Sequence, residues 1–326
     1  MVTMRDIAEK CGVSIMTVSR VLNEPNLVSD ATKELILEAC ESLGYIPNSA
    51  AKALVTKETN MIGLVVPDVN YYYTNIIKSI TLTLESRGYG LLLCPYDHRK
   101  EKEAEYLSYL LQGRIDGIIL FPSSLNKDDY VSTNKATTLV VANRIIDGLD
   151  ASSVSSDNYA GSVKIMEHIL SKGYKRVGAI RADTTLGSFN DRLRGYKDVL
   201  FNNGIEYDES IVCASKGLFF HEGYTYAEQL ISKGVDSIFA FNDMCALGVL
   251  KYCSDNAIAV PGDIGVAGFD NIQYLELFDH GLTTVDYNGL ILGEQVSTLI
   301  LNEISNPDFP KRSIVLDPEL IIRKTV

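Results

Sequence analysis

The sequence of 326 residues contains no apolar run that approaches the roughly 18 residues of a membrane-spanning helix. Its first residues, MVTMRDIAEKCG, also lack the basic stretch followed by an apolar one that marks a secretory signal. These two absences predict a cytoplasmic protein with no membrane partner.

Metal-binding and disulfide patterns are missing as well. The six cysteines include no C-x-x-C pair, and the four histidines lie far apart with no H-x-x-x-H spacing. A reducing compartment favours free, buried thiols. The sequence therefore gives no support for a metal site.

The loops and turns that bind cofactors or carry nucleophiles are also absent. No G-x-G-x-x-G follows a predicted strand, and the chain has neither a Walker loop nor a G-x-S-x-G turn. Asp–Arg pairs could imitate an active site, but no nucleophile is paired with a base. We expect no cofactor and no enzymatic activity.

The chain has no excess of positive charge. Its formal net charge is −12 at pH 7, which disfavours wholesale binding to nucleic acids or membranes. Residues 1–60 hold six basic and eight acidic side chains, so this segment is not basic either. If it binds DNA, its non-specific binding should be weaker than that of a basic domain.

Three short helices are predicted near the N-terminus. Thr3 can cap a helix over 4–11, with an acidic residue three positions later as in a capping box. After a turn that contains glycine, Ser14 can cap a second helix over 15–23. A third helix, over 30–44, ends on a glycine.

From Met61 onward, apolar strands alternate with amphipathic helices, as in parallel α/β layers. The length of the chain leaves room for about two domains. In the first half we expect strands at 61–67, 89–95, 116–121 and 137–142, and helices at 75–88 and 102–114. After residue 157 we expect helices at 159–172, 191–204, 223–234 and 246–256, and strands at 176–180, 237–241 and 264–270.

The two halves of this region resemble each other. LLQGRIDGIILF in the first half matches LISKGVDSIFAF in the second, and NMIGLVV matches KRVGAIR at nearly the same offset. Helix–glycine–strand junctions are common in α/β proteins, but two matches favour two similar lobes. Ligands bind outside the carboxyl ends of such strands, which can face each other across a cleft.

The first two helices and their short turn form a helix-turn-helix. Val18, Val21 and Leu22 share one face of the second helix and are expected to pack inward. The opposite face mixes apolar and polar side chains and suits a DNA major groove. A plain helical hairpin with a solvated face would also account for this pattern. The outward residues are Ile15, Met16, Ser19, Arg20 and Asn23.

The run TMRDIAEKCGVSIMTVSRVLNEPNLVSDATKELILEACESLGYIPNSAAKALVTKETNMIGLVVPD resembles the lactose-repressor/galactose-repressor (LacI/GalR) family of bacterial regulators. The elements VS..TVSRVLN and LGY.PN..A..L are highly specific to it. The resemblance continues through GFDN and LTTV, so it covers essentially the whole chain. It implies a small all-α helix-turn-helix head, a hinge helix, and an α/β core with two lobes, like that of periplasmic sugar-binding proteins.

The resemblance also sets domain limits and an oligomeric state. It implies a homodimer, and because no heptad segment follows LIIRKTV we expect a dimer rather than a tetramer. The expected head is 1–46, the hinge and linker 47–60, and the core 61–326, with one lobe formed by 61–157 and 288–315 and the other by 158–287 and 316–326.

For DNA, the resemblance implies base contacts from Ile15, Met16 and Arg20 and phosphate contacts from Thr17 and Ser19, with Asn23 on the same face. Paired hinge helices in the family enter the minor groove, where a leucine separates two base pairs at a cost of a few kcal/mol. Leu54 lies at that position. The hinge motif matches Ser49, Ala50, Ala51, Lys52, Ala53 and Leu54.

For the effector, the resemblance places polar and aromatic side chains at strand ends, as a polyol requires. Two positions depart from the family: Asn143 stands where sugar binders often carry Asp, and Tyr287 where pentose binders often carry Gln. Arg144 and Arg192 could instead bind an anion, and Arg192 and Asp270 could form a purely structural ion pair. The expected effector residues are Asn70, Tyr72, Tyr73, Asn143, Arg144, Arg192, Asn242, Asp270 and Tyr287.

The resemblance thus predicts a sequence-specific DNA-binding regulator, expected to be a repressor, that binds a pseudo-palindromic double-stranded operator. A small sugar or sugar derivative between the lobes would control its affinity for DNA. Whether that effector releases the DNA or acts as a corepressor stays open. Two competing hypotheses are a sugar-binding protein without a role on DNA, and an enzyme that uses the α/β core.

Overall fold

The computed structural model describes residues 2–23, 25–45, 58–113, 115–123, 127–183, 187–273, 275 and 281–326. The chain divides into two compact units, Met1–Thr59 and Asn60–Val326. Each unit is described by itself. In the described part of the chain, no helix has both the length and the apolar character needed to cross a membrane.

The N-terminal unit contains the three predicted helices. The side chain of Asp6 accepts hydrogen bonds from the backbone N–H of Thr3 at 2.7 Å and from its hydroxyl at 2.9 Å. The hydroxyl of Ser14 accepts from the N–H of Thr17 at 3.0 Å. The helices therefore begin where the capping residues predict. They are α1 (Met4–Cys11), α2 (Ile15–Asn23) and α3 (Asp30–Leu43), with a 3-10 turn at Pro25–Leu27.

A small apolar core holds these helices together. Gly12 and Gly44 end α1 and α3 in the left-handed conformation, with φ of 67° and 63°. Leu22 packs against the cluster as predicted. Its fully or nearly fully buried members are Ile7, Ala8, Val18, Val21, Ile36, Ala39 and Cys40.

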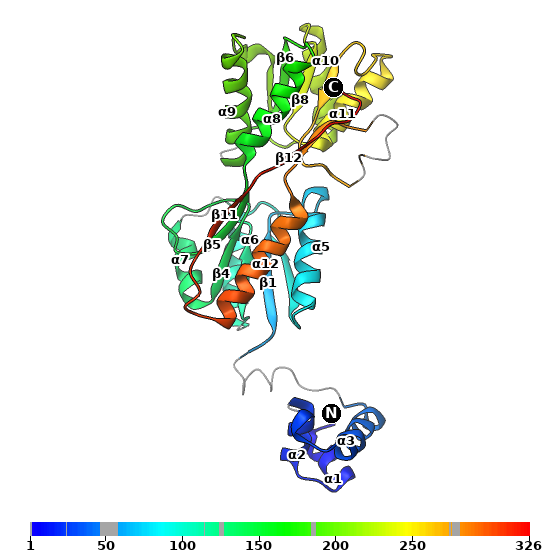
Figure 1. The fold of residues 1–326 in the computed structure, drawn as a ribbon, viewed down its shortest axis with the longest axis vertical. Helices are drawn as coiled ribbons and strands as arrows, with labels where there is room; N and C mark the ends of the chain where they lie inside the picture. The colour runs from blue at the N-terminus through cyan, green and yellow to red at the C-terminus, as the bar shows by residue number, and fades with distance from the viewer. Residues whose placement is uncertain are drawn as a thin grey trace. The chain divides into compact units, whose positions relative to one another are not determined.

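The first lobe of the larger unit is a parallel six-stranded sheet in the order β11-β5-β4-β3-β1-β2. Helices flank it, and α12 returns to it from late in the chain (Figure 1). The strands are β1 (Met61–Val66), β2 (Gly90–Pro95), β3 (Gly117–Leu120), β4 (Thr138–Ala142), β5 (Ser152–Ser156) and β11 (Ser313–Leu316). The helices are α5 (Tyr71–Glu85), α6 (Lys100–Gln112), α7 (Lys127–Ala136) and α12 (Gly289–Ser305).

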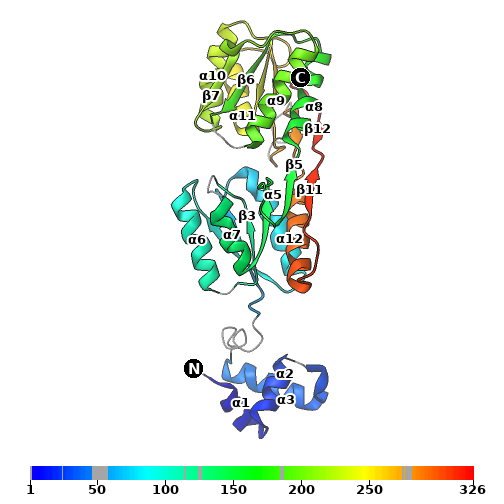
Figure 2. The same ribbon diagram turned by 90° about the vertical axis from the view of Figure 1, so that its left-hand side faces the viewer.

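The second lobe repeats the arrangement with a parallel four-stranded sheet in the order β7-β6-β8-β9. Figure 2 shows its helices on the outside of that sheet. Its strands are β6 (Val177–Ala182), β7 (Val212–Ser215), β8 (Ser237–Ala240) and β9 (Gly265–Ala267). Its helices are α8 (Asn158–Ser171), α9 (Gly187–Asn202), α10 (Phe220–Ser232) and α11 (Asp243–Asp255), with a 3-10 turn at Glu209–Ile211.

Three chain segments pass between the lobes, and they are bonded to one another. The N–H of Asp157, between β5 and α8, donates to the carbonyl of Leu316 at 3.0 Å. The side chain of Asn288, before α12, donates to the carbonyl of Asp317 at 2.7 Å. Lys164 donates to the carboxylate of Asp317 at 2.6 Å. Beside these segments, β10 (Thr284–Asp286) pairs antiparallel with β12 (Glu319–Ile321).

Candidate DNA-binding and effector-binding sites

The outer face of α2 exposes apolar side chains next to a basic one. Ile15 is 45% exposed and Met16 69% exposed, whereas Val18 on the inner face is fully buried. Arg20 is exposed, and Ser19 is half-buried. Exposed Ile and Met beside Arg can contact thymine methyl groups and a guanine edge. Such a face is unusual for a helix that only meets solvent.

The structure describes only some of the remaining residues that were predicted to contact DNA. Thr17 is half-buried, and its hydroxyl lies 2.8 Å from the hydroxyl of Ser14. Asn23 is the last residue of α2, and its side chain lies outside the described structure. The hinge residues Ser49, Ala50, Ala51, Lys52, Ala53 and Leu54 also lie outside the described residues, so their role stays a prediction.

In the second lobe, Arg192 of α9 is buried, and each nitrogen of its guanidinium donates one hydrogen bond. Its Nε donates to Oδ1 of Asn158 at 2.8 Å, and its Nη2 donates to Oδ1 of Asp270 at 3.3 Å. Its Nη1 donates to the carbonyl of Phe241. The guanidinium carbon lies 3.6 Å from the centre of the Phe269 ring, in cation–π contact. The side chain is thereby held in one orientation.

Asp270 and a second carboxyl group share this buried environment. Burial raises the pKa of Asp270 to about 7, although the charge of Arg192 acts to lower it. The pKa of Asp243 is also raised, first by burial and then by the charge of Asp270. Asp243 accepts from the hydroxyl of Thr284 at 2.6 Å and from the N–H of Ile272 at 2.9 Å. It anchors the turn that carries Asp270.

On the first lobe, the predicted aromatic residues Tyr72 and Tyr73 form a chain of rings with Tyr287, which follows β10. Tyr72 stacks on Tyr287, with ring centres 4.4 Å apart and an angle of 21°. Tyr73 meets Tyr72 edge-on at 4.8 Å and Phe121 at 5.4 Å. The hydroxyl of Tyr72 donates to Oδ1 of Asn143 at 3.0 Å. Four of the expected effector residues are therefore linked by direct contacts, because Tyr73, Tyr287 and Asn143 each contact Tyr72.

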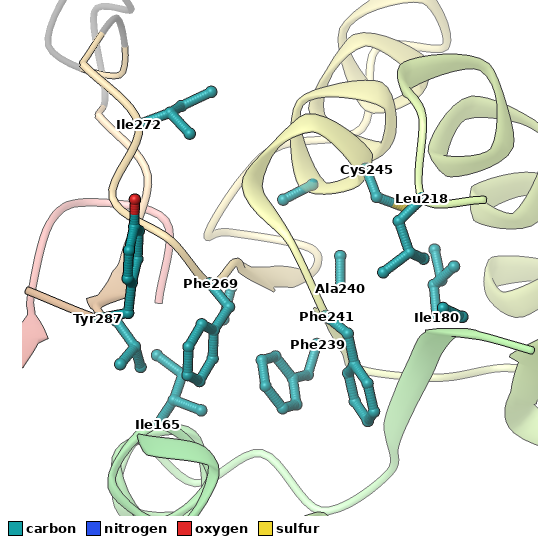
Figure 3. Close-up of a cluster of buried hydrophobic side chains, with 14 of the residues drawn as sticks. Ile165, Ile180, Leu218, Phe239, Ala240, Phe241, Cys245, Phe269, Ile272 and Tyr287 are labelled. Carbon is teal, nitrogen blue, oxygen red and sulfur yellow. The ribbon is translucent and has the colours of Figure 1, made fainter. Parts of the chain in front are cut away.

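The two groups of residues influence each other electrostatically. Burial raises the pKa of the Tyr72 hydroxyl, the charge of Asp270 raises it further, and Arg192 lowers it. The pKa of Tyr287 is likewise raised by burial and by Asp270 among other charges. Figure 3 shows Phe269, which packs on Arg192, beside Tyr287. The structure thus brings the aromatic chain and the Arg192–Asp270 pair to one region.

Two of the predicted residues are engaged as helix caps. Oδ1 of Asn70 accepts from the N–H of Tyr72 at 3.0 Å, and Asn70 is exposed. Asn242 caps α11 by accepting from the N–H of Cys245 at 2.8 Å, and its Nδ2 donates to the carbonyl of Leu218 at 2.8 Å. Both amides shape the turns from which the site residues project.

Arg144 is exposed and has a partner of its own, because its Nη1 donates to the carbonyl of Ser123 at 2.8 Å. Arg192 is instead paired with a buried carboxylate, and only 5% and 7% of the two side chains is exposed. The ion pair that the sequence left open is therefore present. An anion clamp made of both arginines is disfavoured, because both guanidinium groups already donate to protein acceptors.

Asn158 and Phe269 were not predicted as site residues. Asn158 begins α8 directly after the crossing from β5, and Phe269 immediately precedes Asp270 in the GFDN motif. A search for polar residues at strand ends could have found Asn158. Among the described residues, no group of three His, Cys, Asp or Glu side chains could hold a metal ion.

Comparisons with known proteins agree with this architecture. Residues 3–48 match the family model of bacterial regulatory proteins of the lacI family, and residues 166–326 match that of the periplasmic binding protein-like domain. A solved LacI-family transcriptional regulator from Silicibacter pomeroyi superimposes with a TM-score of 0.85 at 28% identity, covering 100% of this chain and 99% of that one. The predicted fold class is confirmed.

Two curated relatives extend the comparison to function. The HTH-type transcriptional regulator DegA of Bacillus subtilis is 31% identical over 98% of this chain and 97% of its own length. The ribose operon repressor of Halalkalibacterium halodurans is 30% identical over 100% of this chain and 97% of its own length. These matches confirm that the chain is a DNA-binding transcription regulator rather than an enzyme. It belongs to the lacI family of bacterial regulatory proteins.

Proposed function

We propose that this protein is a cytoplasmic transcriptional repressor that binds a pseudo-palindromic operator as a homodimer. A small neutral sugar or sugar derivative, held beside Arg192 and Asp270, controls its affinity for DNA. The observation that carries the proposal is the buried Arg192–Asp270 pair, 3.3 Å apart and surrounded by aromatic rings. The pair lies in the larger unit, and in the N-terminal unit the side chains of α2 that we propose to read DNA are exposed.

On operator DNA, the outer face of α2 enters the major groove. Arg20 can donate two hydrogen bonds to a guanine edge, while Ile15 and Met16 contact thymine methyl groups. Thr17 and Ser19 contact phosphates, which fix the register without reading the sequence. Asn23 completes this face. The hinge adds minor-groove contacts from Ser49, Ala50, Lys52, Ala53 and the wedge residue Leu54.

At the effector site, the pairing of donors with acceptors selects the ligand. Arg192 offers donors and Asp270 offers acceptors side by side, so they suit neighbouring hydroxyl groups. Phe189 and Phe269 flank the guanidinium at 5.2 and 3.6 Å, which excludes water from one side. The ribose operon repressor among the relatives is consistent with a sugar effector.

Coupling between the two sites runs through the three crossings. The lobes are taken as 61–157 with 288–315, and 158–287 with 316–326. An effector that favours one arrangement of the lobes must change the hydrogen bonds between the crossings, such as Asn288 to Asp317. The same change alters the spacing of the heads in the dimer and hence the affinity for the operator.

The proposal is tested by footprinting on the promoter region upstream of its own gene, with and without a panel of pentoses and hexoses. We expect protection of a pseudo-palindrome that one sugar weakens or strengthens; the direction distinguishes an inducer from a corepressor. Absence of any protected site under all conditions would count decisively against the proposal.

Arg192→Ala tests the effector site. We expect this variant to lose the sugar-dependent change while it still protects the operator, because the residue contacts the effector and not DNA. Arg176→Ala is the matched control, since Arg176 forms a more exposed ion pair with Asp208 at 3.0 Å. A normal sugar response in Arg192→Ala would place the effector elsewhere.

A further inference from the structure

Tyr287 packs directly against Tyr72, although the two residues lie far apart in the sequence. It follows β10, at one of the crossings between the lobes, and only 4% of it is exposed. Its ring stacks on Tyr72 with centres 4.4 Å apart. Its hydroxyl donates to the backbone carbonyl of the same Tyr72 at 2.5 Å. Both the ring and the hydroxyl are thereby fixed against one residue of α5.

The local backbone is built to receive this ring. A Cβ atom on Gly289 would lie 2.5 Å from the hydroxyl oxygen of Tyr287 and 2.7 Å from its Cζ. Asn288, between them, takes the left-handed conformation with φ of 62°, and its N–H donates to the side chain of Asp286 at 2.7 Å. The absence of a side chain at residue 289 and the turn at residue 288 therefore place the Tyr287 ring against Tyr72.

This arrangement leaves Tyr72 little freedom to stack on a ligand. One face of its ring is covered by Tyr287, and Tyr73 contacts it edge-on at 4.8 Å. Its hydroxyl is bonded to Asn143. An effector can therefore use the Arg192–Asp270 end of the site, but it meets aromatic carbon where a sugar ring would otherwise stack on Tyr72.

We infer that Tyr287 is a specificity-determining residue that limits the effector to a single-ring sugar, because its own ring covers the stacking face that a second sugar ring would use. The inference rests on the proposed function, since it assumes a sugar beside Arg192 and Asp270. Tyr287 excludes larger ligands sterically, and its stacking on Tyr72 together with the turn at residues 288 and 289 holds the ring in the excluding position.

The test compares monosaccharides with disaccharides on the full-length protein by thermal shift and isothermal titration calorimetry. The probes are D-ribose, D-xylose, D-glucose and D-galactose, and the disaccharides cellobiose, maltose and lactose. For wild type we expect binding of at least one monosaccharide and of no disaccharide. For Tyr287→Ala we expect the affinity for at least one disaccharide to rise tenfold or more relative to that for the monosaccharide.

Further variants separate the possible causes. Tyr287→Phe keeps the ring and should keep the wild-type selectivity, whereas Tyr287→Leu, a second ring-free variant, should relax it if Tyr287→Ala folds poorly. Tyr226→Ala is the control, because the Tyr226 hydroxyl also donates to a backbone carbonyl, that of Ala214 at 3.1 Å. It should leave selectivity unchanged.

The outcomes distinguish the inference from the proposal on which it rests. If wild type binds a sugar and Arg192→Ala abolishes that binding, but Tyr287→Ala and Tyr287→Leu keep the wild-type selectivity, only the role of Tyr287 is overturned. A wild-type protein that prefers a disaccharide overturns it as well. If wild type binds none of the sugars, both the sugar effector and the role of Tyr287 are overturned.

Discussion

Asp270 shows how one residue can be costly for folding and useful for binding. Its carboxylate is 7% exposed and is bonded to Arg192, yet burial outweighs that partner and raises its pKa to about 7. The backbone at Asp270 is also unusual, with φ of 116°, a conformation that residues other than glycine rarely adopt. Such a combination is typical of a residue placed for ligand binding rather than for stability.

The raised pKa of Asp270 makes the stability of the protein depend on pH. The folded state holds a proton on Asp270 up to about pH 7, whereas the unfolded chain releases it near the ordinary value of 3.8. This group therefore lowers the free energy of unfolding as pH rises from about 4 to 7, by up to about 4 kcal/mol. We expect wild type to lose stability between pH 5 and 7 in urea unfolding, and Asp270→Asn to lose less.

Asp208→Asn is the control for that experiment. Hydrogen bonds from Ser210 hold the pKa of Asp208 below its ordinary value, so this group should not affect the slope between pH 5 and 7. Equal slopes for wild type and Asp270→Asn would show that the carboxylate is ionised throughout this range.

Single residues also show what could be predicted from the sequence. Arg192, Asp270 and the tyrosines were expected on the basis of the family resemblance, and the structure brings them to one region. The contact between Tyr72 and Tyr287 could not be predicted, because it joins residues far apart in the chain and depends on how the crossings pack. Nor does any local pattern indicate that Arg144 bonds to the carbonyl of Ser123.

At the scale of elements, most of the apolar strands and amphipathic helices between residues 61 and 270 were predicted, whereas the polar strand β5 and the elements after residue 270, α12 among them, were not. β5 has the sequence SSVSS and is buried at all five positions. It lies between β4 and β11, where the hydroxyl of Ser153 bonds to that of Ser313 at 3.1 Å. The hydroxyl of Ser152 likewise accepts from the N–H of Arg312 at 2.9 Å. The sequence alone does not reveal these neighbours. Helix starts such as Tyr71 of α5 were also predicted a few residues too late.

Helices α10 and α11 pack through two glycines with almost no space between the backbones. A Cβ atom on Gly223 would lie 1.9 Å from the carbonyl oxygen of Cys245, and one on Gly248 would lie 2.0 Å from that of Phe220. Real Cβ atoms do not approach backbone atoms so closely, so a side chain at either glycine would force the two helices apart. The pair is therefore a rigid block of the second lobe.

Gly223→Ala should destabilise the protein, although alanine is the better helix former by about 1 kcal/mol. We expect a loss of about 1–3 kcal/mol, as for overpacked cores, seen as a fall in the melting temperature of several degrees. Gly113→Ala is the matched control, because a Cβ atom there would have its nearest neighbours at 3.5 Å. A melting temperature that is unchanged or higher in Gly223→Ala would contradict the close packing of α10 on α11.

At the scale of the whole molecule, charge limits how this regulator can bind DNA. The chain carries a net charge of −12, and residues 1–60 have more acidic than basic side chains. Most of the affinity that is independent of sequence comes from basic residues that displace counterions from phosphates. A regulator with this composition should therefore depend on base contacts and on docking of the hinge more than on bulk attraction.

This dependence can be measured by removing acidic charge from the head. Glu38 and Glu41 are exposed on α3, and the variant Glu38→Gln/Glu41→Gln makes residues 1–60 neutral. We expect its affinity for non-operator DNA to rise several-fold at low salt and much less at physiological salt, because exposed charges are screened over about 8 Å there. Affinity for the operator should rise by a similar factor, so that the ratio of specific to non-specific binding stays nearly constant.

The control is the variant Glu206→Gln/Glu228→Gln in the larger unit, also at exposed positions, which changes the net charge equally. If it raises non-operator binding as much as the head variant does, net charge and not the charge of the DNA-binding unit sets the affinity.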